Sequence, residues 1–399
     1  MPEISAKNKQ LFFSPIRKLT PYAVAAKKRG VKVFHLNIGQ PDIESPEIFL
    51  QKVKEFNQKT VAYEKSDGSE ALKLSLVKYY QKLGLEIKDE DLVVTSGGSE
   101  ALQWLFFILF DSGDECLCFE PTYTNYLTFA ELGGVKLRPV LTRLEDNFQL
   151  TEAKTLLDQV NEKTKAIIIT NPSNPTGAVY PPKMLEETVN FCLKKDLFII
   201  TDETYREFIY GAVKTVSLLS FKKAEQLVVL ADSLSKRYSL CGARLGMLVS
   251  KNRSIIEMAN KIAQARLASA TIEQYAASFL DQVPSSYFEK VRQEYQLRRD
   301  TLMQELAKIP GVKCSRPDGA FYLIAELPVV DSEDFCKFLL EKFADKQETV
   351  MLAPAADFYV TPGQGKNQVR IAYVLNRTDI KRAVELIGLA LKAYKSVVK

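Results

Sequence analysis

The chain has 399 residues, of which 26% are charged, 46% hydrophobic and 10% aromatic, a composition typical of a globular protein. Its net charge of +5 is spread without blocks of like charge, so we expect no nucleic-acid partner. His35 is the only histidine, which argues against zinc sites and Ser-His-Asp triads, and no metal site is expected.

The remaining composition predicts a cytoplasmic location. No apolar run approaches the roughly 18 residues of a membrane span, and the first ten residues are too polar for a secretory leader, so we expect no membrane partner. The six cysteines are scattered, without a CxxC pair, and are expected to be buried reduced thiols.

Short apolar runs alternate with helical patterns in the first two thirds of the chain, which predicts an α/β fold with a mostly parallel sheet. Seven runs are expected to be strands: residues 92–95, 116–119, 135–140, 166–170, 197–201, 227–231 and 245–249. Residues 70–83 and 183–195 carry apolar side chains at helical spacing and are expected to be helices that pack on the sheet.

After residue 249 the pattern changes to longer helices, which indicates a second domain. We expect helices at 285–308, at 332–343 and from Asp379 onward, and strands at 321–327 and 369–375. The charged run at 294–300 within the first of these helices is expected to be a solvated face.

Polar residues follow several of the expected strands, where ligands bind in open α/β sheets. A glycine turn at 96–98 leads into a helix, and the rigid segment 171–177 displays asparagine amides. Asp202 and Tyr205 follow the fifth strand, and Ser233, Ser235 and Lys236 follow the sixth, with Arg244 further on.

These residues together predict a pyridoxal phosphate site. A lysine amine can bind a carbonyl carbon, and an aspartate can hold a protonated pyridine nitrogen. Serines, an arginine and a helix N-terminus can hold a phosphate.

The motifs, taken in order, resemble the class I/II aminotransferases of fold type I, close to the aspartate aminotransferase branch. They are Asn-Pro-x-Asn-Pro-Thr-Gly at Asn171, Asp-Glu-x-Tyr at Asp202, Ser-x-Ser-Lys at Ser233, Arg244 and Val-Arg-Ile at Arg370. The resemblance covers nearly the whole chain. It implies a large domain at 46–283, with a mostly parallel seven-stranded sheet sandwiched by helices, and a small α+β domain formed by 1–45 and 284–399.

The resemblance also implies roles for single residues. Lys236 resembles the lysine that forms the aldimine with pyridoxal phosphate and moves the substrate Cα proton. Asp202 resembles the partner of the pyridine nitrogen, and Tyr205 and Asn174 resemble the donors to the phenolic oxygen of the cofactor. Tyr123 resembles the aromatic residue that stacks on the ring.

The phosphate would be held by a larger set, namely Gly98, Ser99, the backbone of Glu100, Ser233, Ser235 and Arg244. Tyr63 resembles a tyrosine that reaches the phosphate of a neighbouring subunit, which implies a homodimer with shared active sites. Arg370 resembles the arginine that binds the substrate α-carboxylate, and Gly39 and Asn174 resemble further substrate-binding residues.

The function implied is a ping-pong transamination between an L-amino acid and a 2-oxo acid, with aspartate and 2-oxoglutarate as the first expectation. Aromatic or alanine-type donors remain alternatives, and so does a pyridoxal phosphate-dependent C–S lyase of the same fold. The sequence Cys241-Gly242-Ala243-Arg244 departs from the Thr-Gly-Trp-Arg of many relatives. Of the arginines that could read a side-chain carboxylate, we weigh Arg17, Arg138 and Arg237, and each is expected rather to be a surface or loop residue.

Overall fold

The computed structural model describes residues 2–3, 11, 14–150 and 152–397. Its centre is a seven-stranded sheet in the order β2-β8-β7-β6-β5-β3-β4, in which only β8 is antiparallel to its neighbours. The strands are β2 (Leu92–Thr95), β3 (Glu115–Glu120), β4 (Lys136–Leu141), β5 (Thr164–Thr170), β6 (Phe198–Asp202), β7 (Val228–Ser233) and β8 (Gly246–Ser250).

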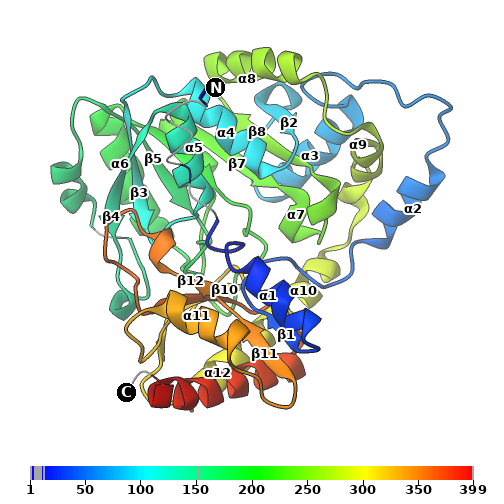
Figure 1. The fold of residues 1–399 in the computed structure, drawn as a ribbon. Coiled ribbons are helices and arrows are strands. Elements are labelled where there is room, and N and C mark those ends of the chain that lie inside the picture. Colours follow the sequence, from blue (N-terminus) through cyan, green and yellow to red (C-terminus); the bar gives the residue numbers. More distant parts are fainter. Residues whose placement is uncertain (1, 4–10, 12–13, 151, 398–399) are drawn as a thin grey trace.

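Helices cover both faces of this sheet (Figure 1). The helices of this region are α2 (Glu47–Glu55), α3 (Glu70–Lys82), α4 (Gly98–Ile108), α5 (Asn125–Gly133), α6 (Pro182–Lys195), α7 (Leu234–Arg237), α8 (Arg253–Arg266) and α9 (Thr271–Ala277), of which α2 packs against α9. Side chains of α4, α5 and α8 share one apolar cluster with Val93, whereas those of α3, α6 and α9 share another with Leu92 and Val94. Successive side chains of β2 enter opposite clusters because side chains of a strand point alternately to the two faces of the sheet.

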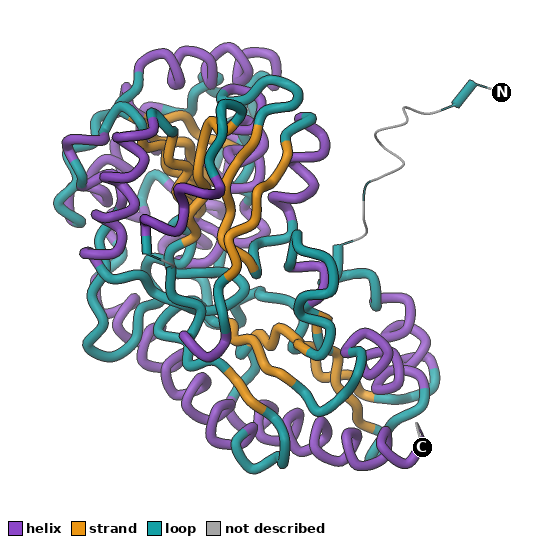
Figure 2. The backbone as a smooth tube through the Cα atoms, turned by 90° about the vertical axis from the view of Figure 1, so that its left-hand side faces the viewer, coloured by secondary structure: helices purple, strands orange, loops and turns teal. Residues whose placement is uncertain are grey.

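A second region combines elements from both ends of the chain. It contains α1 (Thr20–Lys28), β1 (Lys32–His35), α10 (Ser285–Leu306), β9 (Lys313–Cys314), β10 (Tyr322–Glu326), α11 (Ser332–Glu341), β11 (Glu348–Met351), β12 (Ala353–Pro354), β13 (Gln368–Ala372) and α12 (Arg377–Val397). Strand β1 pairs in parallel with β11, and β12, β13, β10 and β9 form a four-stranded sheet. Figure 2 shows this region as a lobe below the one that holds the large sheet.

The α/β fold with a seven-stranded sheet is confirmed. Strands β6 and β7 end later than expected, and the added residues include members of the expected site. Strand β6 includes Asp202 and β7 includes Asp232 and Ser233, so these side chains lie on the last strand residues rather than in the loops that follow. No helix in the described ranges is long and apolar enough to cross a membrane.

Two expectations about charged and sulfur-containing side chains were wrong in part. Arg298 and Arg299 of the charged run are buried, because Arg298 contacts Asp42, Glu294 and the Val374 carbonyl, and Arg299 donates to the Pro317 carbonyl. Of the six free cysteines, Cys116, Cys118, Cys192 and Cys336 are buried, but Cys241 and Cys314 are only half-buried.

Candidate active site

The carboxyl ends of β2, β5, β6 and β7 bring most of the expected site residues to one edge of the large sheet. The side chains arrive there because neighbouring β5, β6 and β7 are parallel, and ligand sites form where such strands end. Strand β8 runs in the opposite direction, so its amino end, with Arg244 and Gly246, meets the same edge.

Asp202 is a buried carboxylate whose hydrogen-bond partners in the described chain are all neutral. It accepts hydrogen bonds from the Tyr126 hydroxyl at 2.9 Å and from the Thr204 amide at 3.1 Å. Burial raises the pKa of Asp202 despite these hydrogen bonds. Among the described residues no cation pairs with it, so a cationic group bound next to Asp202 would be stabilised by its charge.

Lys236 lies on the short helix α7, directly after β7. Its Nζ donates to the Gly39 carbonyl at 2.8 Å and lies 3.5 Å from the Cys241 Sγ. No carboxylate of the described chain forms an ion pair with this amine, so it is available to an incoming carbonyl group. Cys241 was expected only as a buried thiol, and its contact with Lys236 could not be anticipated from their spacing of five residues.

The glycine turn before α4 lies close to the backbone at the start of β8. Gly97 has a φ of +87°, and a Cβ there would lie 2.4 Å from the Arg244 Nη2. A Cβ on Gly246 would lie 2.5 Å from the Gly98 nitrogen. A Cβ on Gly98 would lie 3.4 Å from the Ser233 Cβ, so the start of α4 packs against the segment that carries Ser233. The N-terminus of a helix favours an anion.

The remaining residues expected at a phosphate surround this turn. The Ser233 and Ser235 hydroxyls are 2.9 Å apart, and Arg244 is exposed and donates to the carbonyls of Ser96 and Cys241. The Glu100 carboxylate accepts from Arg266 at 2.8 Å and from the Ser96 amide at 2.7 Å. The Glu100 side chain therefore already has a cationic and an amide partner. Ser99, the next expected residue, lies beside Tyr123.

Arg370 is 1% exposed and faces the site from β13 in the other lobe. Its Nη1 donates to Asn174 Oδ1 at 3.0 Å and its Nη2 to the Asn37 carbonyl at 2.6 Å, while Nε has no partner in the described chain. Burial lowers the pKa of Arg370, because among the described residues no carboxylate compensates its charge. A buried guanidinium of this kind favours an incoming anion, such as a carboxylate.

Tyr322, on β10, connects several of these groups and was not expected as a site residue. The Arg370 guanidinium lies 4.4 Å from its ring centroid, and its hydroxyl lies 2.9 Å from the Tyr205 hydroxyl. A Cβ on Gly39 would overlap the Tyr322 hydroxyl, at 1.6 Å. The only sequence signal was the apolar run of the strand expected at 321–327, which does not distinguish a site residue from a core residue.

Tyr123 and Tyr63 have contrasting surroundings. Burial raises the pKa of Tyr123 to about 12, and its ring packs edge-on against Tyr126 at 5.4 Å between centroids. Tyr63 lies between α2 and α3 and is 79% exposed, and within the described chain no hydrogen bond or ring contact joins it to the other expected site residues.

The three arginines weighed as readers of a substrate side chain also differ. Arg17 is exposed, and Arg138 pairs with Glu115 at 3.4 Å on β4. Arg237 was expected at the surface, but it is 2% exposed and pairs with Asp232, so that expectation was wrong. His35 is half-buried, its Nδ1 lies 3.3 Å from Asn37 Oδ1, and burial lowers its pKa.

Comparison with known proteins agrees with this arrangement. Residues 31–387 match the family Aminotransferase class I and II. An aspartate aminotransferase of Bacillus subtilis strain 168 is 32% identical over 94% of this chain and 96% of its own length. A probable aspartate/prephenate aminotransferase of Aquifex aeolicus is 30% identical over 95% and 96%.

Solved structures give the same result. An aspartate aminotransferase from Thermotoga maritima superposes with a TM-score of 0.88 at 30% identity, covering 98% of this chain and all of that one. An alanine aminotransferase from Pyrococcus furiosus gives 0.89 at 28% identity with the same coverage. The chain belongs to the class I and II aminotransferases. Within that family it is a pyridoxal phosphate-dependent, aspartate aminotransferase-like enzyme that catalyses transamination between amino and 2-oxo acids.

Proposed function

We propose that the amino donor is L-aspartate and the acceptor 2-oxoglutarate, and that the residues at the edge of the large sheet form the active site. The donor proposal is supported by the names of the curated relatives, among them the aspartate aminotransferase of Bacillus subtilis. The proposal for the site rests above all on Arg370, a buried guanidinium with one nitrogen unpartnered in the described chain, which fits a substrate carboxylate.

The residues present fit pyridoxal phosphate. Asp202 is a buried carboxylate with no cationic partner in the described ranges, so it would hold the protonated ring nitrogen. Ser99, Ser233, Ser235, Arg244 and the first amides of α4, from Gly98 and Glu100, would hold the phosphate. Tyr123 would lie against the ring, and Asn174 and Tyr205 would donate to its phenolic oxygen.

When bound, the cofactor supplies an electron-withdrawing ring that stabilises negative charge at the substrate Cα. Arg370 would bind the substrate α-carboxylate through its fork of N–H groups, with Asn174 fixing the orientation of that fork. Lys236 Nζ would remove the proton from the substrate Cα and hold it, because its flexible side chain can reach that atom. Gly39 would allow the substrate to approach Tyr322 and Arg370 closely.

We further infer a homodimer in which Tyr63 reaches the phosphate of the partner subunit. Tyr63 and Val61 are 79% and 57% exposed, and the segment that carries them is fixed by a 2.8 Å hydrogen bond from Thr271 to the Ala62 carbonyl. A fixed segment with exposed apolar side chains suits an interface. Mass measurement by light scattering tests this, since a monomer at micromolar concentration contradicts it.

The division into a large domain at 46–283 and a small domain from 1–45 and 284–399 is also a proposal. It is supported by the separate apolar cluster that α1, β1, α10, β10, α11 and α12 share. A cytoplasmic location is supported by the six free cysteines.

The donor is tested by mixing the cofactor-loaded protein with single amino acids and following the absorbance of the cofactor, with the 2-oxo acid product identified by mass spectrometry. We expect aspartate to react with the highest kcat/KM and to give oxaloacetate. A higher kcat/KM for alanine or for an aromatic amino acid would show that the donor is wrong while leaving the reaction class intact.

A further inference from the structure

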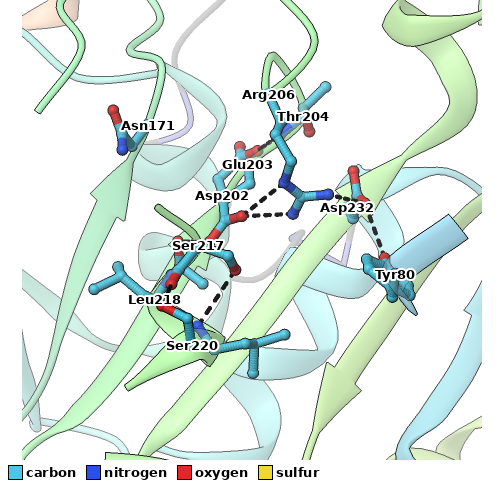
Figure 3. Close-up of polar contacts among 12 residues, drawn as sticks. Tyr80, Asn171, Asp202, Glu203, Thr204, Arg206, Ser217, Leu218, Ser220 and Asp232 are labelled. Carbon is cyan, nitrogen blue, oxygen red and sulfur yellow. Dashed lines mark hydrogen bonds and ion pairs between the residues drawn. The ribbon is translucent and has the colours of Figure 1, made fainter. Parts of the chain in front are cut away.

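A buried cluster of charged side chains connects the two strand ends that carry the proposed cofactor-binding residues. We call Glu203, Arg206, Asp232 and Arg237 the Asp232 cluster. Arg206 donates to Glu203 at 2.9 Å and lies 3.3 Å from Asp232, which also pairs with Arg237. Figure 3 shows Arg206 between the Glu203 and Asp232 carboxylates, with Tyr80 beyond Asp232.

The position of the cluster along the chain is what relates it to the site. Glu203 and Arg206 immediately follow Asp202 and Tyr205, respectively, at the end of β6. Asp232 and Arg237 enclose the segment that carries Ser233, Ser235 and Lys236 at the end of β7. The ion pair between Arg206 and Asp232 is therefore a direct side-chain link between the two segments.

Each member of the cluster is held on more than one side. The Glu203 carboxylate also accepts from Ser217 at 2.9 Å, from Leu218 N at 3.1 Å and from Thr201 at 3.1 Å. Asp232 accepts from Tyr80 at 2.8 Å and from the Ser233 amide at 2.7 Å. The Arg237 guanidinium lies 4.1 Å from the Tyr79 ring centroid. Such a network leaves little freedom in the relative position of the two strand ends.

The charges within the cluster compensate one another. Its two carboxylates and two guanidinium groups pair internally, and neither arginine contacts Asp202. Burial raises the pKa of Asp202, and the nearby charge of Asp232 adds to that rise. Because Asp232 and Glu203 hold both arginines, the negative charge of Asp202 stays free for a cationic ligand.

We propose that Asp232 is a positioning residue of the cofactor site, which acts through Arg206 and Arg237 to fix Asp202 and Tyr205 relative to Ser233, Ser235 and Lys236. The inference rests on the cofactor-binding roles proposed above. It assigns to Asp232 a function beyond that of a buried ion pair that only stabilises the fold.

Asp91 provides a matched control. It is also 0% exposed and paired with two cations, Lys251 at 2.7 Å and Arg253 at 3.0 Å. It precedes β2 at the amino end of that strand, opposite the edge that carries the site. Asp232→Asn and Asp91→Asn thus remove the same charge from the same kind of environment. In each, the amide can keep the hydrogen bonds to backbone N–H groups.

The experiment measures three quantities for the wild type and both variants: the midpoint of thermal unfolding, the Kd for pyridoxal phosphate, and the pH midpoint of the absorbance change of the bound cofactor. We expect both variants to unfold at lower temperature. Only Asp232→Asn should weaken cofactor binding, by about tenfold or more, as loss of a group that orients ligating residues commonly does, and only it should move the pH midpoint.

An unchanged Kd and pH midpoint in folded Asp232→Asn would overturn the proposal. If that variant does not fold, Arg206→Gln takes its place, because Glu203 keeps its three other donors and Asp232 keeps Arg237. It should weaken cofactor binding in the same direction, and wild-type affinity in it would equally overturn the proposal. Lys236→Ala in the same assay separates a failure of the proposed function from a failure of the role of Asp232. If Lys236→Ala keeps the wild-type absorbance of the bound cofactor, the proposed function is wrong.

Discussion

The hydroxyl of Tyr322 lies 2.9 Å from the hydroxyl of Tyr205, and this hydrogen bond joins β10 of one lobe to the loop after β6 in the other. Both side chains are buried. The same Tyr322 ring lies under the guanidinium of Arg370. One side chain therefore contacts a residue proposed to bind the cofactor and a residue proposed to bind the substrate.

Tyr322→Phe removes this hydrogen bond and keeps the ring beneath Arg370. We expect the free energy of unfolding to fall by about 0.5–1.5 kcal/mol, the usual worth of a neutral hydrogen bond, measured by urea denaturation of the apo protein. Tyr205→Phe is the control, and the double variant should lose no more than either single variant. Additive losses would show that the two hydroxyls do not interact.

Arg370→Lys replaces a planar fork by a point charge. We expect KM to rise by about tenfold or more for every amino donor, since charge-assisted hydrogen bonds are worth about 1.5–3 kcal/mol and the lysine cannot reproduce both. Steady-state kinetics with aspartate and alanine provide the measurement. A rise confined to aspartate would place Arg370 at the side chain of the substrate instead of its α-carboxylate.

Asp202→Asn should have opposite effects on stability and on cofactor binding. Folding raises the pKa of the Asp202 carboxyl above its value in the unfolded chain, which is about 4. The protonated carboxyl therefore stabilises the folded protein at low pH, and this stabilisation is lost as the pH rises from about 4 through the raised pKa. The apo form of Asp202→Asn should lack this pH-dependent loss of stability and be at least as stable as the apo wild type at neutral pH. The same variant should bind pyridoxal phosphate more weakly. Thermal unfolding of both apo proteins across this pH range, with cofactor titrations, tests the pair of effects.

Lys236→Ala should abolish transamination and the visible absorbance of the bound cofactor. The fold should survive, because Nζ is half-buried and in the described chain forms only the contacts with Gly39 and Cys241. Lys222→Ala, which removes an exposed lysine paired with Glu86, is the control and should keep wild-type turnover. Measurable turnover in Lys236→Ala would remove the assigned role.

Alkylation should inactivate the enzyme through Cys241. Burial raises the pKa of Cys116, Cys118, Cys192 and Cys336 and shields them, whereas Cys241 is half-buried beside the Lys236 amine. Iodoacetamide should label Cys241 ahead of Cys314, which is also half-buried but has a pKa raised by burial. Peptide mass spectrometry measures the labelling, and Cys241→Ser should protect activity. Inactivation that proceeds equally in Cys241→Ser would contradict this.

The sequence was sufficient for the elements with strong periodicity. The strand expected at 92–95 matches β2, and the other six expected strands of the large sheet differ from the observed ones by at most two residues at either end. The strand expected at 369–375 ends three residues earlier, at Ala372 of β13. Motif order gave Asp202, Lys236 and Arg370 as candidate site residues, and the fold places them at one edge of the sheet or on the lobe that faces it.

What the sequence did not predict depends on contacts distant along the chain. Arg237 looked like a surface residue, but Asp232 neutralises it within the core. Arg298 is buried for a similar reason, since Asp42, far away in sequence, supplies its partner. Charged residues are assigned to the surface by default, and only the fold reveals a buried counter-ion.

The hydrogen bonds of Arg370 also affect the order in which the site can form during synthesis. Its guanidinium joins Asn37 and Asn174 to β13, and it follows every other proposed site residue in the chain. A ribosome therefore completes the proposed cofactor-binding residues, up to Arg244, long before it adds the arginine that would bind the amino acid. Because domains generally fold as units in the order of their synthesis, the strand ends of the proposed large domain should form before this arginine is added, and the ability to bind a substrate should come last.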